Sequence, residues 1–498
     1  MYAYDTERTL AEGKCAVDEL FRFVEENASR LEAHEAEKAT FKLLLPIGLA
    51  AMKTYFAKRG TGDVGPEVKR ADGVALDREA ALRERDYFSI FGKFDVPRTC
   101  YRTGGEPGVF PLDEQVNLPE RCYSYFLQEW MTLFAVEHPF RETGGLFGEL
   151  FDLKIVESVV MAVARDAHKD YDSFYQQRAA PESKEDLLIT GFDGKGVPVI
   201  KEEAAKLTAK LGSGEKRQKK KEALVGVCYT VEAKPRMAEA LAEQLVDPES
   251  ARKRREESGE DDATPRATNV RRMASLVRTK EEVMDAIKAD AEKRDPKHKR
   301  PLAILLDGDL KLWRLVVARF REWKKKFFVL DIIHVISYLW LAANALFGEE
   351  SPEGKRWVRA KLTELFKGNV GYVIGALKSI LKKRRLRKSK REALRTVIRY
   401  FHNHRRWMKY DDYLARGLPV STGAIESACG SLVKHRMEGD GKRWGLTGAE
   451  AVLLLRSLKK SHANDLKAYW PYRANQERRR LYESGPGWRP VAHLRLVA

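Results

Sequence analysis

The stretch LLITGFDGKGVPVI, residues 187–200, places an acidic residue at the end of an apolar run. Its first half predicts a strand that ends at Asp193, and Gly194 begins a turn that leads into a second short strand. A third strand is expected over 224–233, LVGVCYTVEA, after a lysine-rich loop at 216–221. A carboxylate at the end of a buried strand has little conformational freedom, so Asp193 is a candidate for chemistry.

Two further apolar segments follow downstream. PLAILLD (301–307) predicts a fourth strand that ends at Asp307, again directly before a glycine, and FFVLDIIHV (327–335) predicts a fifth. Helices are expected over 279–293 and 309–323, whereas the polar stretch 247–275 is typical of a linker. The resulting order βββαβαβ is the ribonuclease-H-like arrangement, an α/β fold in which helices cover a mixed sheet.

Helical periodicity dominates the remainder of the chain. Apolar residues recur at helical spacing from about 7 to 58, which indicates either a helical pair packed on the rest or a hairpin for dimerisation or DNA ends. Residues 87–101 alternate as in a β-hairpin. Two helices, 141–151 and 154–166, have the spacing of a helix-turn-helix, although the second carries little positive charge.

The composition favours a polyanionic partner. The chain has 498 residues, and 91 Lys and Arg against 73 Asp and Glu give a net charge of +18. Nucleic acid is the first partner to consider for such a surplus, although basic surfaces also serve solubility. The five scattered cysteines form no CxxC pair, which argues against a zinc ribbon or a disulfide framework and fits a reducing cytoplasm. With DNA as the partner, the expected location is cytoplasmic and nucleoid-associated.

One segment imitates a membrane span. Residues 327–347 are long enough to cross a bilayer, but Asp331 and His334 fall inside the segment. Because an intramembrane carboxylate is costly, a buried strand that runs into a buried helix is the better interpretation. No membrane partner is expected.

Three acidic residues stand out by context: Asp193, Asp307 and Glu426. The first two end apolar strands before glycines, and Glu426 lies in the first turns of a helix that begins near Thr422. Each alone has an ordinary explanation, since Asp-Gly is a common turn and a glutamate in a first turn is a common capping residue. Together they would form a strongly negative pocket suited to two magnesium or manganese ions, the arrangement that serves phosphodiester chemistry.

Neighbouring polar residues leave two choices open. Asp309 competes with Asp307, although Gly308 is expected to end the strand and place Asp309 at the start of the next helix. Asp331 and His334 are candidates for an auxiliary role as ligands or orienting groups. A histidine in an apolar stretch is as readily a hydrogen-bonded core residue.

Four motifs resemble bacterial insertion-sequence transposases of the Kra group, which are related to the Mutator-like DDE transposases. They are FDGKGVPV (192–199), LLDGDLKLW (305–313), LDIIHVISYLW (330–340) and STGAIESACGSLVKHRMEGDGKRWG (421–445). The resemblance implies a ribonuclease-H-like core interrupted by a helical insertion, with Asp193, Asp307 and Glu426 as the metal-binding catalytic acids. It also implies that Asp331 and His334 match the signature that these families place after the second acid.

The implied reaction is hydrolysis at transposon ends followed by attack of the freed 3′-hydroxyl on target DNA. Double-stranded terminal repeats and target DNA are the expected partners, and the joining of two ends suggests a dimer. Related families often carry Lys or Arg seven residues after the glutamate, where this chain has Val433, with Lys434 next and rotated by ~100°. The residues expected to contact DNA are Lys382, Lys383, Arg384, Arg385, Arg387, Lys388, Lys434, Arg436 and Arg443.

These expectations divide the chain into six parts. They are an N-terminal helical region (1–80), a β-hairpin and helical DNA-binding domain (85–175), the first part of the catalytic core (183–334), a helical insertion (335–415), the last catalytic helix segment (416–460) and a basic C-terminal tail (461–498). Two other functions remain open, a catalytically inactive DNA-binding protein derived from a transposase and a structure-specific nuclease of the same fold.

Overall fold

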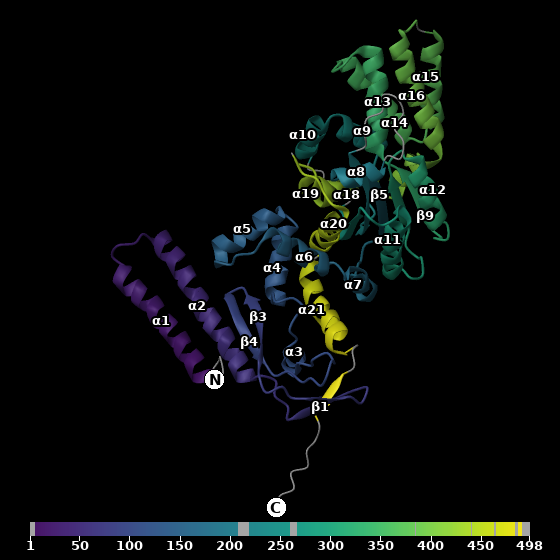
Figure 1. Cartoon of the computed structure of the whole chain (residues 1–498). Coiled ribbons are helices and arrows are strands. Elements are labelled where there is room, and N and C mark those ends of the chain that lie inside the picture. Colours follow the sequence, from purple (N-terminus) through teal and green to yellow (C-terminus); the bar gives the residue numbers. More distant parts are fainter. Residues whose placement is uncertain are drawn as a thin grey trace, which may run out of the picture. The chain divides into compact units, whose positions relative to one another are not determined.

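A computed structural model describes residues 5–207, 219–258, 266–383, 385–439, 441–462, 465–483 and 487–490. The chain divides into two compact units (Figure 1), one formed by residues 1–176 and 466–498 and the other by residues 177–465. The expected loop at 216–221 lies partly outside the described residues. Within the described part, no helix is long and apolar enough to cross a bilayer.

The first unit begins with two antiparallel helices, followed by short strands and a helical cluster. Its elements are α1 (Thr6–Asn27), α2 (Ala33–Arg59), β1 (Glu67–Arg70), β2 (Ala75–Asp77), β3 (Arg83–Ser89), β4 (Gly92–Arg98), α3 (Pro111–Gln115), α4 (Tyr125–Ala135), α5 (Phe140–Phe151), α6 (Glu157–Ala167), α7 (Tyr171–Gln177), α21 (Asp465–Arg478), the π-helix η3 (Arg479–Glu483) and β10 (Trp488–Pro490). The predicted helical pair, the β-hairpin and the two candidate helix-turn-helix segments are thus all formed.

Apolar side chains of α4, α5 and α6 build the main core of this unit around Leu127, Met131 and Phe147. The C-terminal segment returns to the same unit. β10 pairs with β1, and the hydroxyl of Tyr469 on α21 donates to the carbonyl of Ala167 at 2.5 Å. The expected basic tail therefore contains a helix and a strand that belong to the first unit.

The second unit contains a five-stranded mixed sheet with the order β7-β6-β5-β8-β9. The strands are β5 (Leu187–Pro198), β6 (Lys220–Val231), β7 (Thr268–Ser275), β8 (Leu302–Leu306) and β9 (Lys326–Leu330). β5, β6 and β7 are antiparallel, whereas β8 and β9 run parallel to β5. The sheet confirms the α/β class with a mixed sheet.

Two of the predicted strands are corrected by the structure. Residues 187–198 form one continuous strand and not two strands around a turn at Gly194, because all twelve residues of β5 pair with β6. The missing third strand is β7, which lies inside the stretch predicted to be a linker. Residues 259–265 of that stretch lie outside the described residues.

Helices cover both faces of the sheet. They are α8 (Lys201–Leu207), α11 (Lys280–Arg294), α12 (Leu310–Arg319), α18 (Gly423–Ala428), the π-helix η2 (Cys429–Lys434), α19 (His435–Met437) and α20 (Leu446–Lys460). Two further helices, α9 (Ala238–Val246) and α10 (Pro248–Ser258), pack on each other, and α9 packs on α14 (Pro352–Phe366). α11 packs on one face, where a Cβ on Gly226 would meet Ile287 at 2.8 Å. α18 and α20 pack on the other face, and Ser457 of α20 accepts from the amide of Ala274 on β7.

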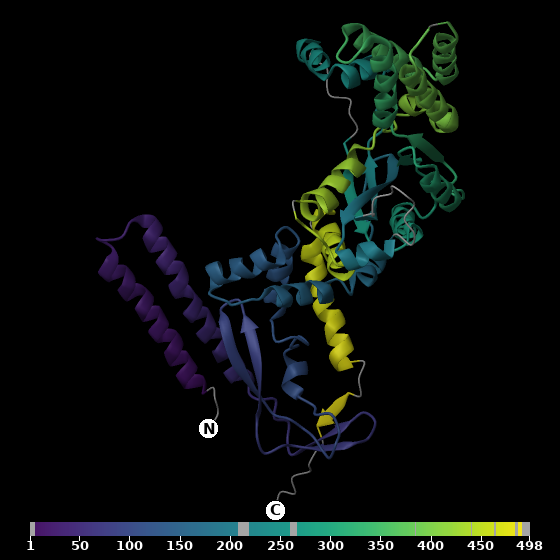
Figure 2. The same cartoon turned by 45° about the horizontal axis from the view of Figure 1, so that its top comes forward.

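The remaining helices of this unit follow β9 and gather beside one end of the sheet in both views (Figures 1 and 2). They are α13 (Ile332–Phe347), α14 (Pro352–Phe366), α15 (Val370–Lys383), α16 (Lys388–His404), the 3-10 helix η1 (Arg405–Trp407) and α17 (Tyr410–Ala415). The two ends of this helical region meet, because the amide of Ile332 donates to the carbonyl of Val420 at 2.9 Å.

Candidate active site

Strand register brings Asp193 and Asp307 together. β5 and β8 are parallel neighbours, and their last pair in register is Phe192 with Leu306. Asp193 and Asp307 are the next residues of the two strands, so both stand at the same carboxyl edge of the sheet. β8 ends there, whereas β5 continues to Pro198 along β6.

The environment of Asp193 resists its ionisation. Burial raises the pKa of the Asp193 carboxyl, and the neighbouring charge of Asp307 raises it further. The Cys429 thiol, the Gly194 amide and the charge of His334 act in the opposite direction. A carboxylate held beside a second carboxylate in a partly buried place is typical of a site that takes a cation.

The turn after Asp307 is fixed by hydrogen bonds. The amide of Asp309 donates to Oδ1 of Asp307 at 2.9 Å, and the indole of Trp313 donates to the Asp307 carbonyl at 2.7 Å. Asp309 itself accepts from the amide of Lys311 at 2.8 Å and is the N-cap of α12. Asp307, and not Asp309, is therefore the acid at the strand end, as predicted.

Gly308 allows α16 to approach this turn. A Cβ on Gly308 would lie 2.5 Å from the ring of Tyr400, so the position has no room for a side chain. His404, one turn further along α16, lies with Nε2 3.1 Å from the Gly308 carbonyl oxygen. The Tyr400 hydroxyl is buried and makes no hydrogen bond to any described residue.

The helix that carries Glu426 packs directly over Asp193. A Cβ on Gly191, two residues before Asp193 and on the same face of β5, would lie 3.6 Å from Cβ of Ile425, so the absent side chain brings α18 close to the strand. The thiol of Cys429 then donates to Oδ2 of Asp193 at 3.3 Å. Glu426 lies one helical turn before Cys429. Burial is the largest cause that raises the pKa of the Cys429 thiol, and the charges of Asp193 and Glu426 raise it further.

Asp331 ties this helix to α13. Its fully buried carboxylate caps α13 by accepting from the amides of Ile333 and His334, each at 3.3 Å. It also accepts from the amide of Thr422 at 3.0 Å, and the hydroxyl of Thr422 donates to Glu426 at 3.4 Å. A chain of hydrogen bonds thus leads from α13 to the third predicted acid.

Asp331 holds the His334 ring beside the acids. Its Nδ1 lies 2.8 Å from Oδ2 of Asp331, and this hydrogen bond is the main reason why the pKa of His334 is raised. The charges of Asp331, Asp307 and Asp193 raise this pKa as well. Asp331 therefore has a positioning role, whereas the half-exposed side chain of His334 is accessible to a ligand.

The three acids do not form a complete metal-binding group. Among the described residues, no set of three or more His, Cys, Asp or Glu side chains is arranged to hold a metal ion. Asp193 and Asp307 share the strand edge, but the exposed Glu426 is held by Thr422. Magnesium is commonly bound by one or two carboxylates with substrate phosphates and waters, and the two aspartates fit that mode.

A π-helix follows Glu426 and changes which residues share its face. In an uninterrupted α-helix the seventh residue after Glu426, Val433, would share that face. The π turn of η2 takes in one additional residue, so the eighth residue, Lys434, comes to that position. Burial agrees, because Val433 is fully buried and Lys434 is exposed.

A buried arginine supports the π turn. Nε of Arg456 on α20 donates to the carbonyls of Ser431 and Leu432 at 3.1 and 3.0 Å. Arg436 is also buried, with its guanidinium 4.7 Å from the centre of the Trp444 ring, which argues against a direct phosphate contact. Arg443 is exposed and available to one.

The predicted basic run lies at the junction of α15 and α16. Its exposed members are Lys382, Lys383, Arg385, Arg387 and Lys388, while Arg384 lies outside the described residues. The exposed face continues along α16 through Arg395 and Arg399, opposite the side of α16 that Leu394, Val397 and Phe401 bury. The sequence motifs did not single out these two arginines, although their i, i+4 spacing from Arg391 was visible.

Sequence reasoning also missed Cys429, Thr422 and Arg456. The spacing of three from Glu426 could have placed Cys429 on the same helical face. Thr422 was considered only as a cap of the helix. Arg456 carried no local signal, because the carbonyls it serves lie 24 and 25 residues earlier in the chain.

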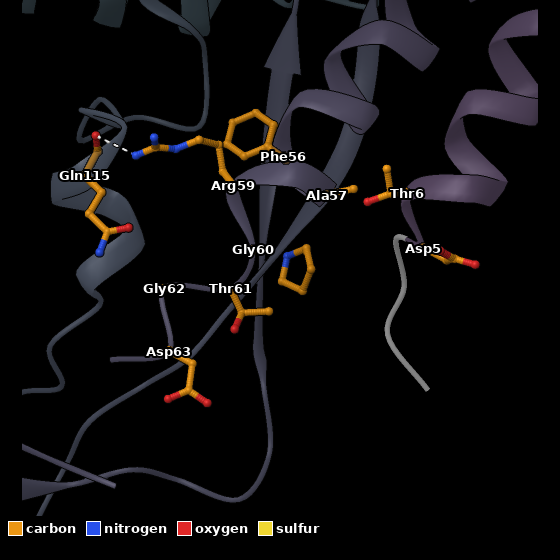
Figure 3. Close-up of a pocket in the computed structure, with 11 residues that line it drawn as sticks. Asp5, Thr6, Phe56, Ala57, Arg59, Gly60, Thr61, Gly62, Asp63 and Gln115 are labelled. Atoms are coloured by element: carbon orange, nitrogen blue, oxygen red, sulfur yellow. Dashed lines mark hydrogen bonds between the residues drawn. The ribbon is translucent and has the colours of Figure 1, made fainter. Parts of the chain in front are cut away.

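A separate pocket of about 480 Å³ lies in the first unit, between the start of α1, the end of α2 and β4. Figure 3 shows Arg59 and Asp63 on its wall, with Arg59 donating to the carbonyl of Gln115 at 3.3 Å. None of the predicted acids contributes to it.

Comparison with known proteins does not identify a family for this chain. No protein-family model matches the chain, and a comparison with curated proteins found no match. Among solved structures, the chain is similar to the Drosophila P element transposase strand transfer complex, with 9% identity over 70% of this chain and 80% of that chain. The TM-score of 0.24 does not establish a shared fold.

Proposed function

We propose that this chain is a bacterial insertion-sequence transposase of the DDE type, which cuts DNA at transposon ends and joins the freed 3′-hydroxyl to target DNA. The observation that carries the proposal is the register that sets Asp193, within β5, beside Asp307, directly after the parallel strand β8. A helix that bears a third acid, Glu426, packs over the same edge through Gly191 and Cys429. Three acids from such distant parts of the chain are expected to act together on one phosphodiester.

Two divalent ions, magnesium or manganese, would be held by Asp193 and Asp307, with Glu426 completing the set when DNA is bound. When bound, such ions activate the attacking hydroxyl and stabilise the leaving oxygen. The raised pKa of Asp193 supports this assignment, because a cation would relieve the repulsion between the two carboxylates.

The other residues of the site bind and orient. Asp331 fixes α18 through Thr422 and holds the His334 ring through Nδ1. Since the pKa of His334 is raised, the ring binds its proton more strongly than a free imidazole, and a protonated ring would attract a phosphate. Lys434 shares the helical face of Glu426, so it would bind the DNA strand on which the acids act.

The basic surface of α15 and α16 would hold the DNA backbone. Each Lys or Arg that neutralises a phosphate releases counterions, so binding should weaken steeply with salt. This surface, together with the net charge of +18, supports double-stranded DNA as the partner and the nucleoid as the location. The joining of two ends would use at least a dimer.

The test is a cutting and joining assay on terminal-repeat DNA with magnesium. The variants are Asp193→Asn, Asp307→Asn and Glu426→Gln, each of which should lose about 10²-fold or more of the cutting rate. Glu222→Gln is a matched control, because Glu222 lies beside Gly194 on the other face of β5 and pairs with Lys280 at 2.9 Å. Equal loss in the control, or no loss in the three variants, contradicts the assignment.

A second function, a non-cutting DNA-binding protein derived from a transposase, is favoured by the exposed position of Glu426 away from a complete metal-binding group. It predicts metal-independent binding of the terminal repeat and no strand cutting under any condition. A structure-specific nuclease of the same fold would cut, but it would never produce joined strands in the same assay.

A further inference from the structure

The helical hairpin at the start of the first unit carries exposed apolar side chains that no described part of the chain covers. On α1 they are Leu10, Val17, Phe21 and Val24, and on α2 they are Leu44 and Tyr55. Phe21 is 63% exposed, more than a large aromatic side chain is in most monomers.

The apolar residues of α1 form one stripe. Leu10, Val17 and Val24 are spaced by seven, and Phe21 falls between them at the spacing of a neighbouring turn. α1 packs along α2 with a different side, on which Thr9 and Leu20 are buried (Figure 2). The stripe therefore borders the contact between the two helices and is exposed on its outer side.

Both helices contribute to a single face. A groove of about 560 Å³ lies between Leu10, Gly13 and Val17 of α1 and Ile47 and Ala51 of α2. Small residues form its floor, and the exposed stripe of α1 borders it. The result is an apolar surface two helices wide, of the kind that pairs with another helical pair in a four-helix bundle.

The charges of the two helices indicate what covers this face. α1 holds six acidic and three basic residues, whereas α2 holds two acidic and five basic ones. Three of the basic residues of α2 have partners within the same unit, because Lys53 pairs with Glu12 of α1 and both Lys42 and Arg59 donate to backbone carbonyls. Lys38 and Lys58 carry the remaining positive charge of α2. In a chain of net charge +18, the acidic α1 is a poor surface for DNA or an anionic membrane. A hairpin of one acidic and one basic helix is complementary in charge to a second copy of itself related by a two-fold axis. In that arrangement α1 of each copy faces α2 of the other.

We propose that this face pairs with the same face of a second copy of the chain and forms a four-helix dimer interface. The inference stands on the hairpin alone and does not depend on the acidic site of the second unit. It assigns a partner to the N-terminal region, and it locates the contact through which two chains would meet.

The first test measures the mass of the full chain by light scattering after size-exclusion chromatography over a range of concentrations. The wild type should be a dimer, and Val17→Glu with Phe21→Glu should be a monomer with an unchanged melting temperature. Tyr372→Glu is the control, because Tyr372 is 60% exposed on α15 of the other unit. A monomeric wild type, or a dimer that persists in the double variant, overturns the proposal.

A charge exchange makes the test specific for pairing between copies. Asp18→Lys with Glu25→Lys should yield a monomer, and so should Lys58→Glu, because each puts like charges on facing helices. A mixture of the two variants should restore the dimer. Failure of the mixture to pair contradicts the α1-on-α2 arrangement, and retained metal-dependent cutting of a single DNA end by the monomers keeps this result separate from the proposed function.

Discussion

The thiol of Cys429 donates a hydrogen bond to Oδ2 of Asp193 at 3.3 Å, across 236 residues of sequence. This contact joins the helix of the third predicted acid to the strand of the first. Because the thiol favours the ionised form of the carboxyl, it lowers the pKa of Asp193 against the upward effect of burial.

Replacing Cys429 should therefore shift the acidic side of the pH profile of DNA cutting. Cys429→Ala removes the donor, so the pKa of Asp193 should rise further and cutting should fall roughly two- to tenfold at acidic pH. Cys429→Ser keeps a donor and is the matched control. Initial cutting rates between about pH 5 and 8 provide the measurement, and identical profiles for the alanine and serine variants would contradict the role of the hydrogen bond.

Asp193→Asn should stabilise the fold while it abolishes cutting. The folded pKa of Asp193 lies above its ordinary value of 3.8, so the folded state binds the proton more tightly and loses stability as pH rises through that interval. The neutral amide removes this cost at neutral pH, and we expect a melting temperature higher by ~2–4 °C. The melting temperatures of the wild type and Asp193→Asn are compared at about pH 4 and pH 7. A variant that melts below the wild type at pH 7 would contradict the repulsion between Asp193 and Asp307.

Asp331 should be important for stability, and His334 much less so. Asp331→Asn keeps one side-chain oxygen but replaces the other acceptor with a donor, so some of the backbone amides and imidazole that Asp331 serves lose their buried acceptor, which should cost about 2–3 kcal/mol. His334→Gln should cost less than about 1 kcal/mol, because the His334 side chain is 46% exposed.

The ion pair also predicts a pH dependence. The pKa of His334 is raised, so its stabilisation is complete below about 6.5 and is lost as pH rises through the folded pKa. Thermal unfolding of the wild type and His334→Gln at two pH values should show the difference shrinking at alkaline pH. A stability difference between the wild type and His334→Gln that grows at alkaline pH would contradict the raised pKa of His334.

Arg456 should hold the π turn that follows Glu426. Arg456→Met keeps the apolar stem but leaves the carbonyls of Ser431 and Leu432 without this donor, at a cost of about 1–3 kcal/mol. Urea unfolding gives the free energy of unfolding. Arg443→Met, on an exposed position nearby, should change it by less than about 0.5 kcal/mol.

The basic face of α16 should determine the salt dependence of DNA binding. Lys388→Ala with Arg399→Ala should reduce the slope of log affinity against log salt by about 0.9 for each lost contact. Lys367→Ala is the control, since Lys367 pairs with Glu239 at 2.7 Å. Fluorescence anisotropy at several salt concentrations measures the affinity of the double variant and of the control. An unchanged slope in the double variant would show that α16 does not contact DNA.

The place of Asp307 was predictable because it depends on a local signal. The apolar run that stops at Asp307 before a glycine marks the end of β8, and the N-cap role of Asp309 follows from Gly308. The same pattern at Asp193 does not end a strand, because β5 continues to Pro198 along β6. The fifth strand was drawn too long, since β9 ends at Leu330 and Asp331 caps α13. An aspartate before a helical apolar pattern was a signal that could have corrected it.

β7 could not be predicted, because its polar residues are satisfied only by distant partners. Arg271 pairs with Asp290 at 3.6 Å, and the amide of Arg272 donates to Ser461. Glu450 accepts from Ser275 at 2.7 Å. A sequence that reads as solvated linker thus forms a sheet edge once α20 covers it, and the π turn depends on the same distant helix.

The hydrogen bonds that close the base of the helical region have a consequence for how this domain tolerates change. The amide of Ile332 donates to the carbonyl of Val420 at 2.9 Å, and Asp331 accepts from the amide of Thr422 beside it, so the 87 intervening positions begin and end at one place. Because a longer segment between two fixed ends costs little additional loop entropy, the parts of this region that do not contact Gly308 can be lengthened or shortened while Asp193 and Asp307 keep their places. α16 is the exception, since Tyr400 and His404 pack on Gly308 directly after Asp307.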